Sequence, residues 1–271
     1  MKTSRLLWGT IGLTASLTTL LFIGGFLYAS NQILFPRAAS SDLNISKPAE
    51  QKDKLIEGKD KLNIVALGDS LSAGTGDATG KGYVGQVRDK LEQQTGKPVF
   101  VLNNLAIPGY TTKEVLTDLG LKKTKDALAE ANIILLTIGG NDIFQGGAGI
   151  LNGTDLQEFN AKAAEDRMGH ALANVDKILA QVNQANPNAV IFYVGLYHPF
   201  SDLDPKKEGD LVVQKWNSRV FTMTNRYPNM VLVPIYDLFE RNLLKYLSTD
   251  HFHPNQDGYA RIAERIAQIL K

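Results

Sequence analysis

Three polar residues in this sequence have the types and the order of a nucleophile with its base. Ser70 lies in the stretch GDSL at 68–71, directly after the apolar run 62–67, where a strand should end and a turn begin. Near the C-terminus, Asp250 and His253 are three residues apart, ahead of a helical pattern. A serine hydroxyl is a useful nucleophile only when a base takes its proton, and an acid orients that base. We therefore expect Ser70 as nucleophile, His253 as base and Asp250 as its acid partner.

Acyl transfer by a serine also requires hydrogen-bond donors that stabilise the oxyanion of the tetrahedral intermediate. The sequence offers three candidates: the backbone N–H of Ser70, the backbone N–H of Gly109 and the side-chain amide of Asn141. Glycine at 109 would let the backbone come close to the reacting carbonyl. We expect these three groups to form the oxyanion hole.

The elements that must position these groups are read from an alternation of patterns. From residue 61 onward, short apolar runs alternate with helical patterns, which is typical of βαβ units and a parallel sheet. The runs lack a polar alternation, as expected of strands covered on both faces. The five candidate strands are 62–67, 99–102, 133–138, 190–194 and 231–235. The candidate residues follow these strands, and open parallel sheets bind ligands beyond the carboxyl ends of their strands.

The predicted domain therefore covers residues 61–271 as a three-layer α/β/α fold, closed by a C-terminal helix. Pro254 suits the first position of that helix, which would hold His253 at a rigid corner. Asp69 is expected to brace the turn that holds Ser70, and Asp142 to support the loop that holds Asn141.

Four sequence blocks together resemble those of the GDSL or SGNH hydrolase family, in matching order and over essentially the whole of residues 61–271. The blocks are 68–71 (GDSL), the segment holding Gly109, 139–142 (GGND) and 250–253 (DHFH). The similarity is nearest to the membrane-anchored bacterial lipase/acylhydrolase branch. It implies a flavodoxin-like fold with a parallel five-stranded sheet. It also implies hydrolysis of an ester, thioester or amide-like acyl bond through an acyl-enzyme, with the same catalytic and oxyanion residues.

The N-terminus has the pattern of a membrane anchor. Residues 6–29 carry no charge and, at about 1.5 Å per residue, can cross a hydrocarbon core of about 30 Å. Lys2 and Arg5 precede this segment, which predicts a cytoplasmic N-terminus and an extracytoplasmic catalytic domain in a single-pass protein of the cell membrane. The domains expected are an uncleaved transmembrane anchor at 1–29, a flexible polar linker at 30–60 and the hydrolase domain at 61–271.

Composition excludes several other classes. Lys and Arg number 29 against 28 Asp and Glu, so no basic surface is indicated for nucleic acid. The absence of cysteine excludes disulfides, thiolate metal sites and a cysteine nucleophile. His251 and His253 lack a third preorganised ligand, so we expect neither metal nor cofactor. Gly74, Gly76 and Gly80 fail the dinucleotide-binding spacing and are interpreted as loop glycines.

The sequence leaves the ester substrate open. Phe144, Leu151, Tyr197 and Phe200 fall in predicted loops near the active edge and could line an acyl pocket. A lipase or acylhydrolase acting on a small-molecule or lipid ester, such as a lysophospholipid, is the first hypothesis. The alternatives are a carbohydrate or peptidoglycan O-acetyl esterase and a noncatalytic, surface-anchored binding module on the same fold. No pattern indicates the oligomeric state.

Overall fold

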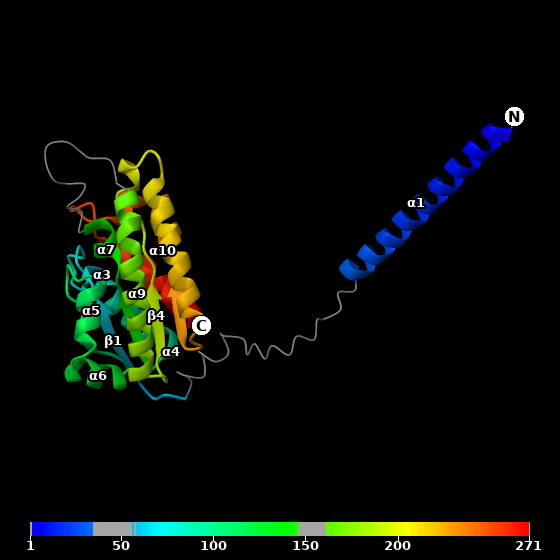
Figure 1. Cartoon of the computed structure of the whole chain (residues 1–271). Helices are drawn as coiled ribbons and strands as arrows, with labels where there is room; N and C mark the ends of the chain where they lie inside the picture. Colours follow the sequence, from blue (N-terminus) through cyan, green and yellow to red (C-terminus); the bar gives the residue numbers. More distant parts are fainter. Residues whose placement is uncertain (1, 35–55, 57, 146–160, 271) are drawn as a thin grey trace. The chain divides into compact units, whose positions relative to one another are not determined.

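The computed structural model describes residues 2–34, 56, 58–145 and 161–270 (Figure 1). The chain divides into two compact units, 1–45 and 46–271. Most of the expected linker at 30–60 lies outside the described residues, as does Leu151.

The N-terminal unit contains one long helix, α1 (Lys2–Leu34). Its segment Leu7–Asn31 has a mean hydropathy of 1.7 and is long and apolar enough to cross a membrane. Hydroxyl side chains within the segment donate to carbonyls of the preceding turn, as Thr14 does to Thr10 and Ser16 does to Gly12, which satisfies them without water. The helix continues past residue 29, where the anchor was expected to end, because no proline interrupts the chain before Pro36.

The second unit is built on a five-stranded parallel sheet in the order β2-β1-β3-β4-β5. The strands are β1 (Leu62–Gly68), β2 (Val99–Asn104), β3 (Ile133–Thr137), β4 (Val190–Val194) and β5 (Met230–Val233). All five expected strands are present, with boundaries shifted by at most two residues. The expected fold class is confirmed. The winding direction reverses between β1 and β3, which is the topological switch point where such sheets bind ligands.

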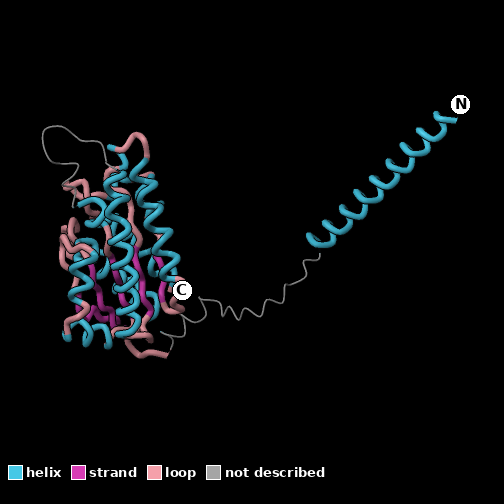
Figure 2. The backbone as a smooth tube through the Cα atoms, viewed as in Figure 1, coloured by secondary structure: helices cyan, strands magenta, loops and turns pink. Residues whose placement is uncertain are grey.

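Helices cover both faces of this sheet (Figure 2). They are α3 (Ser70–Ala73), α4 (Gly82–Thr95), α5 (Thr112–Asp118), α6 (Lys122–Ala129), α7 (Gly140–Phe144), α9 (Ala161–Ala185), α10 (Glu208–Thr224), α11 (Tyr236–Glu240), α12 (Leu243–Tyr246) and α13 (Gln256–Ile269), with a 3₁₀ turn η2 (Ser201–Leu203). The described helices α9 and α10 lie side by side in Figure 1.

Alternate strand residues enter two separate cores. In β1, Val65 and Leu67 pack with α5, α6, α9 and α10, whereas Ile64 and Ala66 pack with α4 and α13. The same alternation holds in β3 and β4, so each central strand is buried on both faces. This double burial explains why the strands read as unbroken apolar runs.

Candidate active site

The turn after β1 presents Ser70 and has no room for a larger residue at Gly68. Gly68 has φ +125°, and a Cβ there would lie 1.8 Å from the carbonyl oxygen of Thr137. Asp69 then caps α3: its carboxylate accepts from the Leu71 N–H at 3.1 Å and from Thr137 Oγ1 at 2.7 Å. Ser70 is consequently held, 4% exposed, at the first position of α3. The interpretation of Asp69 as a brace is confirmed.

A buried hydroxyl cluster behind this turn was missed by the sequence analysis. Ser72 Oγ lies 2.8 Å from Thr137 Oγ1 and 2.7 Å from the Tyr83 hydroxyl, while Thr137 Oγ1 also accepts from the Ser72 N–H. The cluster ties the serine turn to the end of β3 and to α4. In the sequence, this cluster is indicated only by Thr137, a polar residue at the end of the apolar run IILL.

The structure brings the three expected triad residues into one line. His253 Nε2 lies 2.8 Å from Ser70 Oγ, and His253 Nδ1 lies 2.6 Å from Asp250 Oδ2. Because a carboxylate only accepts, the neutral ring carries its proton on Nδ1 and presents Nε2 as the acceptor for the serine hydroxyl. This is the arrangement that lets a histidine act as base for a serine.

Asp250 is held by more hydrogen bonds than the sequence indicated. Its Oδ1 accepts from Ser248 Oγ at 2.7 Å and from the N–H groups of Phe252 and His253 at 2.9 Å. Partial burial raises the pKa of Asp250, but these hydrogen bonds and the one from the His253 ring outweigh it and hold the pKa well below its usual range. The carboxylate therefore stays charged beside the His253 ring.

The rigid corner after His253 is made by Asn255, not by Pro254. α13 begins at Gln256, and Asn255 is its N-cap, with the side chain accepting from the Gly258 N–H. The Asn255 amide also donates to the carbonyls of Lys245 and Leu247. The expectation of Pro254 at the first helical position was wrong. The position just before the helix is taken by Asn255, whose side chain accepts a hydrogen bond from a free helix N–H. A proline side chain cannot accept such a bond.

Two of the three expected oxyanion donors, Gly109 and Asn141, lie on linked elements that follow β2 and β3. The loop after β2 stays paired with β1, since the Ile107 N–H donates to the Gly68 carbonyl at 3.1 Å. Gly109, further along this loop, has φ +86° with open space around it. The Asn141 amide, in α7, donates to the Tyr110 carbonyl at 2.8 Å. An amide carries two N–H groups, and this bond uses one of them.

Asp142 fixes α7 to the start of α5. Its carboxylate accepts from the Thr112 N–H at 2.9 Å and from Thr112 Oγ1 at 2.7 Å. The Arg167 guanidinium adds bonds to the carbonyls of Asp142 and Ile143. The expected supporting role of Asp142 is confirmed, and Arg167 is a further support that the sequence did not reveal.

An apolar cleft, partly open to solvent, lies next to the turn of Ser70 and the loop of His253. Its walls include Leu71, Phe144, Leu196, Tyr197, Pro199 and Phe252. Leu71 and Phe252 are the chain neighbours of Ser70 and His253. Of the expected pocket residues, Phe144 and Tyr197 line the cleft, with Phe144 in α7 rather than in a loop, whereas Phe200 packs behind it against Phe144 and Phe252.

His198 supports the wall of this cleft. Its ring is 2% exposed, stacks on Phe144 with centroids 5.4 Å apart, and places Nε2 3.3 Å from Asp204 Oδ2. Burial lowers the pKa of His198, against the carboxylates of Asp210 and Asp204, which raise it. In the described part of the chain, no three His, Cys, Asp or Glu side chains are grouped to hold a metal ion.

The sequence model of the GDSL-like lipase/acylhydrolase family matches residues 66–261. The chain belongs to this family. It is 30% identical to the uncharacterized protein YpmR of Bacillus subtilis over 86% of this chain and 91% of that protein. It is 24% identical to the spore germination lipase LipC of Bacillus licheniformis over 76% of this chain and 94% of LipC.

Among solved structures, the lipase Lip_vut3 from a goat rumen metagenome shares the fold, with a TM-score of 0.67 and 23% identity over 77% of this chain and 97% of that chain. As a GDSL-like lipase/acylhydrolase, the chain is an ester hydrolase, so the expected enzyme class is confirmed.

The depressed pKa of Asp250 makes a stability prediction. The charged form is favoured in the folded state, so its contribution is present above the unfolded-state pKa of about 3.9 and is lost as the pH falls from there through the folded-state pKa. In urea titrations of the detergent-solubilised full chain, we expect Asp250→Asn to be less stable than wild type at pH 7. The difference should narrow at pH 3. A difference that is equal at both pH values would contradict this account.

Proposed function

We propose that the chain hydrolyses carboxylic esters with Ser70 as nucleophile, His253 as base and Asp250 as the acid partner. The observation that carries the proposal is the alignment of Ser70 Oγ, the two His253 ring nitrogens and Asp250 Oδ2, at 2.8 and 2.6 Å. Proton transfer requires a base within hydrogen-bond reach of the proton it removes, and His253 meets that requirement before any substrate binds.

In the first half of the reaction, His253 Nε2 takes the Ser70 proton while Ser70 Oγ attacks the ester carbonyl. The tetrahedral intermediate collapses when the C–O bond to the alcohol breaks and His253 returns the proton to that oxygen. The resulting acyl-enzyme is hydrolysed by water, which His253 deprotonates, and the proton then returns to Ser70. Asp250 keeps the ring in the required tautomer and stabilises its charged form.

The proposed oxyanion donors are the N–H groups of Ser70 and Gly109 and the amide of Asn141. Ser70 begins α3, so its N–H is one of the helix's unpaired donors. Asn141 is fixed by the bond of its amide to the Tyr110 carbonyl, which supports preorganisation of its remaining N–H. One such donor typically lowers the barrier by about 2.7–4 kcal/mol.

The cleft beside Ser70 supports a substrate with an apolar acyl chain. Its described walls are mainly aliphatic and aromatic, and the polar groups near it belong to the triad turn. An O-acetyl ester would place only a methyl group in this cleft and would leave most of its aliphatic and aromatic walls without a contact. We therefore favour a lipase or acylhydrolase acting on a lipid or small-molecule ester over an O-acetyl esterase.

Loss of the nucleophile or the base should abolish turnover. With p-nitrophenyl esters from acetate to palmitate, we expect Ser70→Ala and His253→Ala to lose about 10⁴-fold or more in kcat. Ser218→Ala, at an exposed position on α10, should match wild type. A folded wild-type chain inactive on every ester, or one unaffected by Ser70→Ala, would favour the noncatalytic binding module.

The cleft should set the preferred chain length. Phe144→Leu enlarges it, so the ratio of kcat/KM for long to short acyl chains should rise by about fourfold for each further methylene that becomes buried. Phe100→Leu makes the same change at a half-exposed position on β2 and should leave the ratio unchanged. An unaltered chain-length profile in Phe144→Leu would assign the acyl chain to another surface.

We also propose that α1 spans a membrane once and leaves the catalytic domain on the extracytoplasmic side. The support is the apolar segment Leu7–Asn31, preceded by Lys2 and Arg5. Because the chain has no cysteine, single cysteines report its orientation directly. In intact cells, a membrane-impermeant maleimide should label Ser218→Cys but label Thr3→Cys only after permeabilisation. The reverse pattern would place the domain in the cytoplasm.

A further inference from the structure

Residues 74–82, called here the brace loop, connect α3 to α4 and pack against the loop that holds His253. At Gly76 the backbone has φ +94°, and a Cβ there would lie 2.6 Å from the Pro254 carbonyl oxygen and 2.9 Å from His253 Cβ. It would also lie 3.1 Å from Ser248 Oγ, the hydroxyl that donates to Asp250. The Gly76 backbone therefore lies against His253 and against Ser248, whose hydroxyl holds Asp250.

The residue before Gly76 ties the brace loop to both sides of the site. The Thr75 N–H donates to the Ser70 carbonyl at 3.0 Å. The Thr75 carbonyl accepts from the hydroxyl of Tyr259, a buried residue of α13, at 2.6 Å. Because α13 follows the His253 loop directly, the Thr75 backbone links the serine turn, through its N–H, to the helix that supports the histidine, through its carbonyl.

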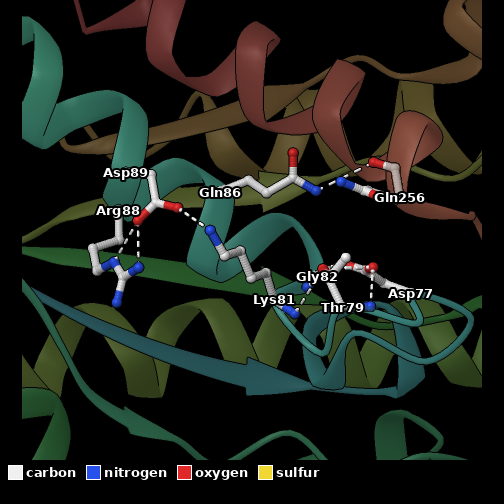
Figure 3. A network of polar contacts seen from close by, with 8 residues as sticks. All are labelled: Asp77, Thr79, Lys81, Gly82, Gln86, Arg88, Asp89 and Gln256. Atoms are coloured by element: carbon white, nitrogen blue, oxygen red, sulfur yellow. Dashed lines mark hydrogen bonds and ion pairs between the residues drawn. The ribbon is translucent and has the colours of Figure 1, made fainter.

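The residue after Gly76 fixes the shape of the brace loop. Asp77 is 7% exposed, and its carboxylate accepts from the Thr79 N–H at 2.8 Å, from Thr79 Oγ1 at 2.7 Å and from the Gly82 N–H at 2.9 Å (Figure 3). A buried carboxylate is costly unless it is hydrogen-bonded. Here the bonds that satisfy it all close the loop on itself, so they define where Gly76 lies.

We propose that Gly76 and Asp77 are positioning residues: the brace loop holds His253 Nε2 in register with Ser70 Oγ. The inference rests on the proposed function, in which these two atoms exchange a proton. On its other side, the His253 loop is held by the Tyr197 hydroxyl, which donates to the Phe252 carbonyl, and by its own bonds, such as the Ser248 N–H to the His253 carbonyl. These contacts hold Phe252 and the backbone, whereas the brace loop packs directly against His253 Cβ.

The test is Asp77→Asn, which puts an NH₂ group where one carboxylate oxygen accepts from N–H donors. We expect kcat on a p-nitrophenyl ester to fall about 10- to 100-fold, with KM within about twofold of wild type. The rate of covalent labelling by a small fluorophosphonate should fall in parallel, because it depends on the same proton transfer but not on the acyl cleft. The amount of label bound once the reaction is complete gives the number of folded active sites.

The matched control is Asp126→Asn. Asp126 pairs with Lys122 on α6 and is 58% exposed, and it makes no contact with the brace loop among the described residues. It should keep wild-type kcat and labelling rate. Tyr259→Phe removes only the hydroxyl that donates to the Thr75 carbonyl. It should lower kcat and leave KM unchanged, as Asp77→Asn does. This second variant tests the proposal if Asp77→Asn does not fold.

A purely structural role gives a different result. If kcat per labelled site in Asp77→Asn and Tyr259→Phe equals that of wild type, or if KM rises while kcat is kept, the brace loop does not position His253. Failure of the proposed function is distinguishable from this, because then wild type itself would not be labelled at Ser70.

Discussion

The hydrogen bond between His253 Nε2 and Ser70 Oγ is the constraint on which the rest of the structure depends. It joins residues 183 positions apart, and a shift of about 1 Å is enough to lower the rate of such a reaction about 100-fold. Neither residue can be held by its own segment alone. Ser70 needs the glycine turn closed against Thr137, and His253 needs the bonds of Asp250, Ser248 and the N-cap of α13.

The sheet order provides the common frame. β1 lies between β2 and β3, so the turn holding Ser70 is flanked by the segments that follow both neighbours, namely the loop with Gly109 and the helix α7 with Asn141. On the other face, α13 packs against α4, and this packing brings the C-terminal loop to the same edge. The cleft is then completed by residues next to the reacting ones, since Phe252 lies edge-on to His253 with centroids 4.8 Å apart.

The sequence was sufficient to predict the strands and to identify Ser70, Asp250 and His253 as candidates, which the structure joins by hydrogen bonds. Doubly buried strands are continuous apolar runs, and Ser70, Asp250 and His253 follow such runs in a known order. The sequence did not reveal the residues that hold the site in place, because such a residue can be recognised only from the partner that it binds in the fold. Thr137, Ser248 and Asn255 are ordinary polar residues until the fold shows what they bind. Gly76 looks like a loop glycine, and its reason for lacking a side chain is a contact with residues far along the chain.

Asp69 and Asp250 both carry carboxylates near His253, but their surroundings shift the two pKa values in opposite directions. Asp69 precedes Ser70 in the chain. Burial raises the pKa of Asp69, although the hydrogen bonds from Thr137 and Leu71 lower it. Both of these bonds hold the turn that contains Ser70. Asp250 lies in a loop, where burial is outweighed by four hydrogen bonds, one of them from His253 Nδ1. A group that must stabilise a charged imidazolium has to remain ionised itself. The environment favours the charged form at Asp250 and opposes it at Asp69, which supports the proposal that the acid partner of His253 is Asp250, the residue more distant from Ser70 in the sequence.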